Sequence, residues 1–252
     1  MKKLKVLDLF SGIGGFSLGL ERTGGFETVA FCEIEPFPIE KALNHHWPNV
    51  PVFKDVTKLK GKDVGSVDVI TGGFPCQDIS SSGSGKGLSG ERSGLWSEFA
   101  RLIGEIRPSF VIVENSPNLL TGSNGEWFSQ VLGDLAQIGY DAEWDCISAE
   151  AVGAPHKRER VWVVAYPSSF GQSIPWGLIN AISPAPEAHR EADSLIIFFQ
   201  RQTVPFVCER HDGIPASLVE GGLTGFGNAV DPIIPEQLGY AILEAEKQRN
   251  AA

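Results

Sequence analysis

Residues 5–15 decide the fold of this chain and read Lys5-Val6-Leu7-Asp8-Leu9-Phe10-Ser11-Gly12-Ile13-Gly14-Gly15. The mainly apolar run up to Phe10 predicts a strand, the glycines predict a tight turn, and a helical pattern follows over Phe16–Thr23. Glycine lets the backbone pass close to a ligand, and free N–H groups at the start of a helix attract a carboxylate or a phosphate. A strand, a glycine turn and a helix in this order therefore predict a ligand site at the end of the strand.

Apolar runs continue to alternate with helical patterns as far as residue 166, which predicts an α/β fold with a mainly parallel sheet. The alternation then stops, and six prolines fall in residues 167–215. We interpret residues 167–215 as a small separate module or an extended insert. The other expected strands are Thr28–Cys32, Val67–Thr71, Phe110–Val113, Asp141–Ile147 and Val161–Tyr166, and the other expected helices are Pro38–His46, Gly94–Ile106, Trp127–Ile138 and Pro235–Gln248.

Composition excludes several classes of protein. The chain has 252 residues, enough for one full hydrophobic core, and a charged fraction of 21% argues against a disordered polar chain. No apolar run approaches the roughly 18 residues of a membrane helix, and Asp8 interrupts the apolar start that a signal peptide would need. The four cysteines form no CxxC pair, so we expect no metal site and a reducing cytoplasm. Cys32 and Cys146 fall on expected strands, and we expect both to be buried.

The charge is unevenly distributed along the chain. A formal net charge of −10 would by itself argue against a nucleic-acid partner. However, residues 111–150 hold seven acidic and no basic residues, and residues 212–252 hold six acidic and two basic ones. Residues 1–76 are neutral overall, and residues 151–211 carry a net charge of +1. We therefore expect an acidic back and a balanced-to-basic cleft, which could still hold a polyanion with strong dependence on salt.

An acidic residue follows the glycine turn at the spacing of a nucleoside site. Glu33 lies nineteen residues past Gly14 and ends the second expected strand, where a carboxylate can hold ribose hydroxyls. Asp55 follows the short run Val52–Lys54 and could close the pocket over an adenine edge. Ser17 stands where the dinucleotide fingerprint needs a third glycine, which argues against NAD. The pattern favours another nucleoside-containing cofactor.

A cysteine and a glutamate follow two neighbouring expected strands. Cys76 lies in the loop Gly72–Gln77, at the carboxyl end of a strand, where α/β proteins bind ligands. A deprotonated thiol is nucleophilic, and Glu114 at the end of the next strand could donate a proton if burial raised its pKa. Because no well-placed histidine accompanies Cys76, acyl transfer is unfavourable. The pair suits attack on an electron-poor ring whose nitrogen the acid protonates.

Two arginines precede the strand over Val161–Tyr166. Arg158 and Arg160 are two residues apart, so they point to the same face of an extended segment. Their guanidinium groups could bind phosphates, carbonyl oxygens or a catalytic carboxylate, although an ordinary basic turn is the simpler interpretation of this motif alone.

Taken together, these motifs resemble the cytosine-C5 DNA methyltransferases of the compact bacterial and phage type. The ordered motifs are Phe10–Gly15, Gly73-Phe74-Pro75-Cys76-Gln77, Glu114-Asn115, Arg158-Glu159-Arg160 and Gly227-Asn228-Ala229-Val230. The resemblance covers residues 1–166 and about 210–248. It implies a Rossmann-like catalytic and cofactor-binding domain over 1–166, a short target-recognition region over 167–210 and a C-terminal segment over 211–252 that returns to the catalytic domain.

The resemblance also implies S-adenosyl-L-methionine as the cofactor and a role for each matching residue. Cys76 would attack C6 of a flipped-out cytosine, Glu114 would engage N3 and the exocyclic amine, and Arg160 would hold O2 with support from Arg158. The implied cofactor-binding residues are Phe10, Gly12, Gly14, Glu33, Ile34, Asp55, Val56 and Asn228. The implied DNA-binding residues are Phe74, Pro75, Gln77, Ser80, Ser82 and Lys86.

Three functions remain open on the sequence. The favoured one is methylation of cytosine in double-stranded DNA by a monomer in a bacterial or phage-infected cell, with a cognate restriction endonuclease as a candidate partner. Methylation of a transfer-RNA cytosine and an inactive DNA- or partner-binding relative are the alternatives. Ser116 and His156 depart from the family pattern, and together with the short recognition region they leave the target sequence undefined.

Overall fold

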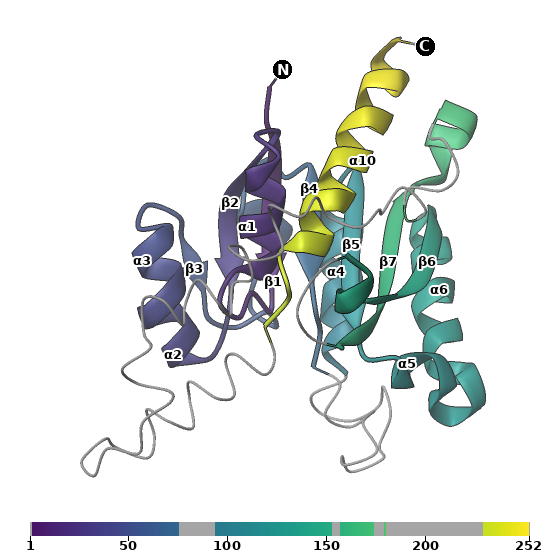
Figure 1. Ribbon diagram of the computed structural model, residues 1–252, viewed down its shortest axis with the longest axis horizontal. Coiled ribbons are helices and arrows are strands. Elements are labelled where there is room, and N and C mark those ends of the chain that lie inside the picture. Colours follow the sequence, from purple (N-terminus) through teal and green to yellow (C-terminus); the bar gives the residue numbers. More distant parts are fainter. Residues whose placement is uncertain (1, 76–93, 153–156, 174–178, 180–228, 252) are drawn as a thin grey trace.

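One seven-stranded sheet organises the part of the chain that the structure describes, which is residues 2–75, 94–152, 157–173, 179 and 229–251 of a computed structural model. The strand order is β3-β2-β1-β4-β5-β7-β6 (Figure 1). The strands are β1 Leu4–Leu9, β2 Phe26–Cys32, β3 Val52–Phe53, β4 Val69–Gly72, β5 Phe110–Asn115, β6 Tyr140–Ser148 and β7 Glu159–Pro167. Strands β1 to β5 pair in parallel, whereas β7 is antiparallel to both β5 and β6. The prediction of a mainly parallel α/β sheet is thus confirmed.

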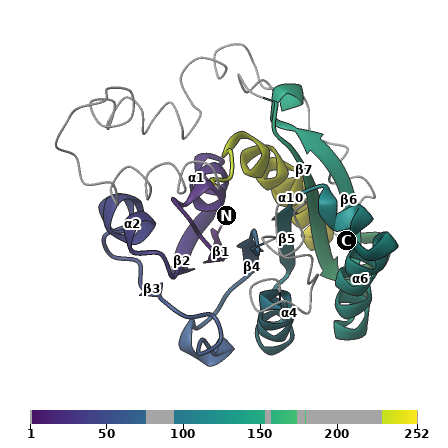
Figure 2. The ribbon, with the colours of Figure 1, turned by 90° about the horizontal axis from the view of Figure 1, so that it is seen from below.

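Helices cover both faces of the sheet (Figure 2). The helices and turns are α1 Gly15–Arg22, α2 Pro36–Pro38, η1 Ile39–Leu43, α3 Asn44–His46, η2 Gly61–Asp63, α4 Leu95–Ile106, α5 Asn118–Thr121, η4 Gly122–Gly125, α6 Glu126–Ile138, η5 Ala149–Val152, η6 Ser168–Ser173 and α10 Ile233–Ala251. Successive strand residues point to opposite faces, so Val111 and Val113 pack in the core with α4 and α6, while Phe110 and Ile112 pack with α1 and α10. The sheet therefore separates two hydrophobic cores.

The close contact between α1 and α10 depends on small residues. A side chain at Gly15 would place its Cβ 2.1 Å from the carbonyl oxygen of Val230, and one at Gly19 would lie 2.2 Å from that of Pro232. On α10, Leu238, Ile242 and Ala245 are buried against the sheet. Residues far apart in the chain thus form one face of the domain.

One helix and one cysteine differ from the sequence predictions. The helix expected over Pro38–His46 is a continuous helical stretch with a central π-helical segment, divided among α2, η1 and α3. Cys32 is buried as expected, but Cys146 is only half-buried because its strand, β6, lies at the end of the sheet order. No helix in the described ranges is long and apolar enough to cross a membrane.

Candidate active site

The loops after β1, β4 and β5 meet at the carboxyl edge of the sheet. Leu9 is in register with Gly72, and Gly72 is in register with Val113, so the three parallel strands end side by side. This arrangement brings together the glycine turn, the loop that begins at Gly73, and Glu114. An edge of this kind is where open α/β sheets bind ligands.

The glycine turn leaves open space at one position and close packing at another. Gly12 has a φ of 52°, and no described atom lies within 4 Å of the place that a Cβ would occupy there. Gly14 has a φ of 86°, and a Cβ there would lie 2.7 Å from the ring of Trp47. Phe10 also has a positive φ, 52°, and its ring stacks against Phe99. The open side of Gly12 is the cradle expected of a turn that admits a ligand close to the backbone.

Glu33 joins the glycine turn to the end of β2. Its Oε2 accepts a hydrogen bond from the backbone N–H of Gly12 at 2.7 Å, and its Oε1 accepts one from Glu35 at 2.8 Å. The carboxylate is buried, while the neighbouring Ile34 is 70% exposed. A carboxylate oxygen can accept more than one hydrogen bond, so Glu33 retains capacity for hydroxyl donors. A buried acceptor beside an exposed apolar side chain fits the ribose and the base of a nucleoside.

Asp55 and Val56 begin the segment after β3. Lys58 at 2.8 Å and Thr57, which donates through both its hydroxyl and its backbone N–H, hold the pKa of Asp55 down at about 2. Asp55 is therefore ionised throughout the neutral range. The side chain of Val56 is buried in the core, so Val56 can meet a cofactor mainly through its backbone.

Glu114 lies between the two arginines and the loop after β4. Its Oε1 is 2.9 Å from Nε of Arg160 and 3.8 Å from Nη2 of Arg158. The strand register explains this contact, because Glu114 is paired with Trp162, and Arg160 lies two residues away on the same face of β7. On the other side, a Cβ at Gly73 would lie 3.0 Å from Oε2. The predicted common face of Arg158 and Arg160 is confirmed, and the carboxylate is the group that both of them face.

Burial and the arginines act on Glu114 in opposite directions. Removal from water raises the pKa of its carboxyl above the ordinary value, and the charges of Arg160 and Arg158 partly offset this rise. Both guanidinium groups are near Oε1, whereas Oε2 faces the loop at Gly73. The geometry thus leaves Oε2 as the oxygen that can carry a proton toward a ligand.

Asn115 fixes the loop that leads to the cysteine, a role that the sequence did not reveal. Its buried side chain donates a hydrogen bond from Nδ2 to the carbonyl oxygen of Phe74 at 3.1 Å. The ring of Phe74 is buried against Trp96, and Pro75 is half-buried. The one feature of the sequence that could have indicated this role is the position of Asn115, immediately after Glu114 at a strand end. Cys76, Gln77, Ser80, Ser82, Lys86, His156 and Asn228 lie outside the described residues.

A buried carboxyl group also lies beneath the glycine turn. Asp8 accepts hydrogen bonds from the hydroxyls of Ser17 at 2.8 Å and Thr71 at 2.9 Å, and burial raises its pKa to about 7. Its backbone carbonyl accepts a hydrogen bond from Ser11 Oγ at 2.6 Å. Asp8 thus links β1, α1 and β4 under the turn. The presence of an acidic residue within an otherwise apolar strand could have indicated this buried carboxyl group from the sequence.

Comparison with known proteins identifies the family. Residues 4–196 match the model of the C-5 cytosine-specific DNA methylases. The chain belongs to this family. It is 37% identical over 164 residues to the type II methyltransferase M1.ScrFI of Lactococcus lactis subsp. cremoris, covering 65% of this chain and 42% of that protein. It is 29% identical over 180 residues to the orphan methyltransferase M.SPRI of Bacillus phage SPR, covering 71% and 41%.

The fold of this C-5 cytosine-specific DNA methylase family member also agrees with a solved structure. DNMT2 of Spodoptera frugiperda superposes with a TM-score of 0.56 at 19% identity, covering 67% of this chain and 51% of that one. This similarity of fold agrees with the Rossmann-like fold that the sequence motifs imply. The chain spans about two fifths of the length of the two methyltransferases named above.

Proposed function

We propose that this chain transfers a methyl group from S-adenosyl-L-methionine to C5 of a cytosine that has been flipped out of double-stranded DNA. The observation that carries the proposal is the buried Glu114, held by Arg160 and Arg158 on one oxygen and facing the Gly73–Pro75 loop with the other. Membership of the C-5 cytosine-specific DNA methylase family supports DNA as the substrate and cytosine as the base.

The proposed reaction begins with Cys76, which directly follows Pro75. Its thiolate forms a bond to C6 of the cytosine, and Glu114 delivers a proton to N3, so the electron pair of the ring reaches C5. The raised pKa of Glu114 favours the protonated carboxyl that this step needs. Arg160, supported by Arg158, keeps Glu114 in place and offers a donor to the base O2.

Methyl transfer to C5 and release of Cys76 from C6 complete the proposed reaction. C5 would then take the electrophilic methyl group that S-adenosyl-L-methionine supplies when bound, with the methyl–sulfur bond broken and S-adenosylhomocysteine as the leaving group. A base then removes the C5 proton, the bond from Cys76 to C6 breaks, and N3 returns its proton to Glu114, so 5-methylcytosine is released and the Cys76 thiolate and the Glu114 carboxyl are regenerated. The cytosine must leave the stack because the duplex shields C6, at a cost of a few kcal/mol.

The proposed cofactor site uses the edge around the glycine turn. Glu33 would accept hydrogen bonds from the ribose hydroxyls, Ile34 would contact the adenine, and Asp55 with the backbone of Val56 would bind the adenine edge. Gly12, Gly14, Phe10 and Asn228 would surround the amino-acid end. The open space at Gly12 and the exposed side chain of Ile34 support this assignment. A cognate restriction endonuclease, a monomeric state and the cytoplasm of a bacterial or phage-infected cell are further parts of the proposal.

Methyl transfer measured on different polymers tests the substrate. Tritiated methyl groups from S-adenosyl-L-methionine should enter double-stranded DNA and should not enter transfer RNA. Incorporation into transfer RNA alone would replace the proposed substrate, and cofactor binding without transfer to either polymer would indicate an inactive binding protein.

Cys76→Ser tests the covalent step. A serine hydroxyl is far less acidic than a thiol, so turnover should fall by at least 1,000-fold, roughly 4 kcal/mol in barrier, while cofactor binding is unchanged. DNA containing 5-fluorocytosine should trap the wild type as a covalent adduct. Fluorine at C5 replaces the proton whose removal must precede cleavage of the bond between Cys76 and C6. Near-normal activity of the variant, or an active enzyme without an adduct, would contradict the mechanism. Cys32→Ser, a change at a buried cysteine on β2, is the control for thiol loss at a non-catalytic position.

A further inference from the structure

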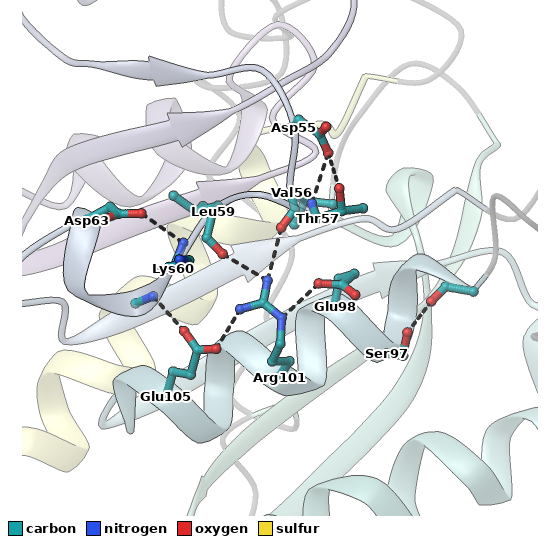
Figure 3. A network of polar contacts seen from close by, with 12 residues as sticks. Asp55, Val56, Thr57, Leu59, Lys60, Asp63, Ser97, Glu98, Arg101 and Glu105 are labelled. Carbon is teal, nitrogen blue, oxygen red and sulfur yellow. Dashed lines mark hydrogen bonds and ion pairs between the residues drawn. The ribbon is translucent and has the colours of Figure 1, made fainter.

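The guanidinium group of Arg101 on α4 holds two backbone carbonyls of the segment between β3 and η2 (Figure 3). Nη2 of Arg101 donates hydrogen bonds to the backbone carbonyls of Val56 at 3.1 Å and Leu59 at 2.9 Å. No resemblance to a known motif assigns a role to this arginine. Its two acceptors lie one and four residues after Asp55, so it constrains the course of the backbone there.

Two glutamates on α4 orient the guanidinium group of Arg101. Glu98 accepts a hydrogen bond from its Nε at 2.8 Å, and Glu105 accepts one from Nη1 at 2.6 Å. Glu105 also accepts a hydrogen bond from the backbone N–H of Gly61 at 2.7 Å. The planar fork with its fixed donors can serve both carbonyls and both carboxylates at once, which the compact ammonium group of a lysine cannot do.

The arrangement connects Arg101 to the proposed base-binding residues. Asp55 holds its own turn through Thr57, but these bonds are local to residues 55–57. The contacts from Arg101 attach that turn to α4, a helix whose Phe99 and Leu102 are buried in the core. Without Arg101, the described hydrogen bonds between this segment and α4 reduce to the one between Glu105 and Gly61, beside the apolar packing of Val56 and Leu59 in the core.

We propose that Arg101 is a positioning residue for the adenine end of the cofactor, an inference that rests on the proposed function. It touches neither cofactor nor DNA and acts by holding Asp55 and the Val56 backbone where they meet the adenine edge. Its loss should therefore weaken recognition of the adenine amino group more than binding of the ribose or the amino-acid end, which depend on Glu33 and the glycine turn.

A ligand pair separates positioning from general stability. Binding of S-adenosylhomocysteine is measured by calorimetry for the wild type and for Arg101→Lys, beside an analogue that has purine in place of adenine and so lacks the amino group. We expect Arg101→Lys to weaken S-adenosylhomocysteine binding about tenfold and to change binding of the analogue less than twofold. In methyl-transfer assays, the same variant should raise KM for the cofactor and leave kcat unchanged.

Arg249→Lys is the matched control. Arg249 also pairs with a carboxylate three residues earlier on its helix, Glu246, and its side chain is 31% exposed compared with 32% for Arg101. It lies on α10, outside the segment that Arg101 holds, so its substitution should leave both affinities unchanged. Glu105→Gln, which weakens the same attachment from the other partner, should show a smaller loss with the same preference for the adenine ligand.

The outcomes distinguish this inference from the proposed function. A wild type that binds neither ligand contradicts cofactor use itself. A wild type that binds S-adenosylhomocysteine, with Arg101→Lys binding it equally well, overturns only the role of Arg101. Equal losses for both ligands in Arg101→Lys and Glu105→Gln, together with a lowered unfolding temperature, would show a general structural role and also overturn the inference.

Discussion

Asp8 shows how one residue can make the stability of this fold depend on pH. Its carboxyl group is fully buried, and its pKa is raised from 3.8 to about 7 mainly by burial, with the charge of Glu33 adding to the rise. The hydroxyls of Ser17 and Thr71 favour the ionised form but do not offset burial. Between these two pH values, the folded state holds a proton that the unfolded state has lost. The stability that Asp8 contributes is therefore complete below about pH 4 and is lost as the pH rises through 7.

Asp8→Asn should remove this dependence. The variant is neutral at every pH, so its free energy of unfolding should rise relative to the wild type between pH 5 and pH 8, by at most about 3 kcal/mol. Urea unfolding at the two pH values measures the difference. Ser17→Ala is the control, because it retains the carboxyl and should retain the pH dependence. A difference between Asp8→Asn and wild type that is the same at both pH values would show that Asp8 does not titrate as described.

At the scale of elements, the sequence predicts what depends on local pattern. The apolar runs around Val6, Val69 and Val111 are in strands, and the βα order makes these strands parallel, as expected. The antiparallel pairing of β7 with β5 could not be predicted, because the local sequence pattern of a strand does not determine which strand it pairs with. The contact of Arg160 with Glu114 follows from that placement, so the sequence supplied both residues but not their pairing. The hydrogen bonds from Arg101 to the segment after β3 could not be predicted, because their acceptors are backbone carbonyls, which every residue type has.

Gly19→Ala tests the contact between α1 and α10. The added Cβ would lie 2.2 Å from the carbonyl oxygen of Pro232, so the helices must separate, and we expect a loss of about 2–3 kcal/mol in the free energy of unfolding. Gly104→Ala on α4 is the matched control, since no described atom lies within 4 Å of its added Cβ. Alanine has the higher helix propensity, so this variant should gain about 0.5–1 kcal/mol. Stabilisation of similar size in both variants would contradict the tight contact.

At the scale of the whole molecule, the two cores share the same strands. Trp96 lies in the core with α4 and α6, Trp162 lies in the core with α1 and α10, and strands β1, β4 and β5 contribute side chains to both. Loss of either core would expose one face of the same sheet. The described domain should therefore unfold in a single cooperative transition.

Ligand binding should shift that transition as a unit. A ligand at a hundred times its Kd raises the free energy of unfolding by about 2.7 kcal/mol if it binds only the folded state. S-adenosylhomocysteine at this excess should move the urea transition equally when followed by tryptophan fluorescence and by far-ultraviolet circular dichroism. Two separate transitions, of which the ligand shifts only one, would mean that the cores are not coupled through the sheet.

The packing of α10 on α1 also sets an order of events during synthesis. The ribosome releases α1 long before it releases residues 230–236, on whose backbone Gly15 and Gly19 pack. Throughout that interval, Phe16, Leu20 and the sheet face with which they pack lack the apolar side chains of α10. The nascent chain must therefore expose this apolar face to water or to a chaperone until residues 229–251 have been made. For the same reason, a chain cut between residues 180 and 228 would yield two fragments with complementary surfaces, and they should reassemble when mixed.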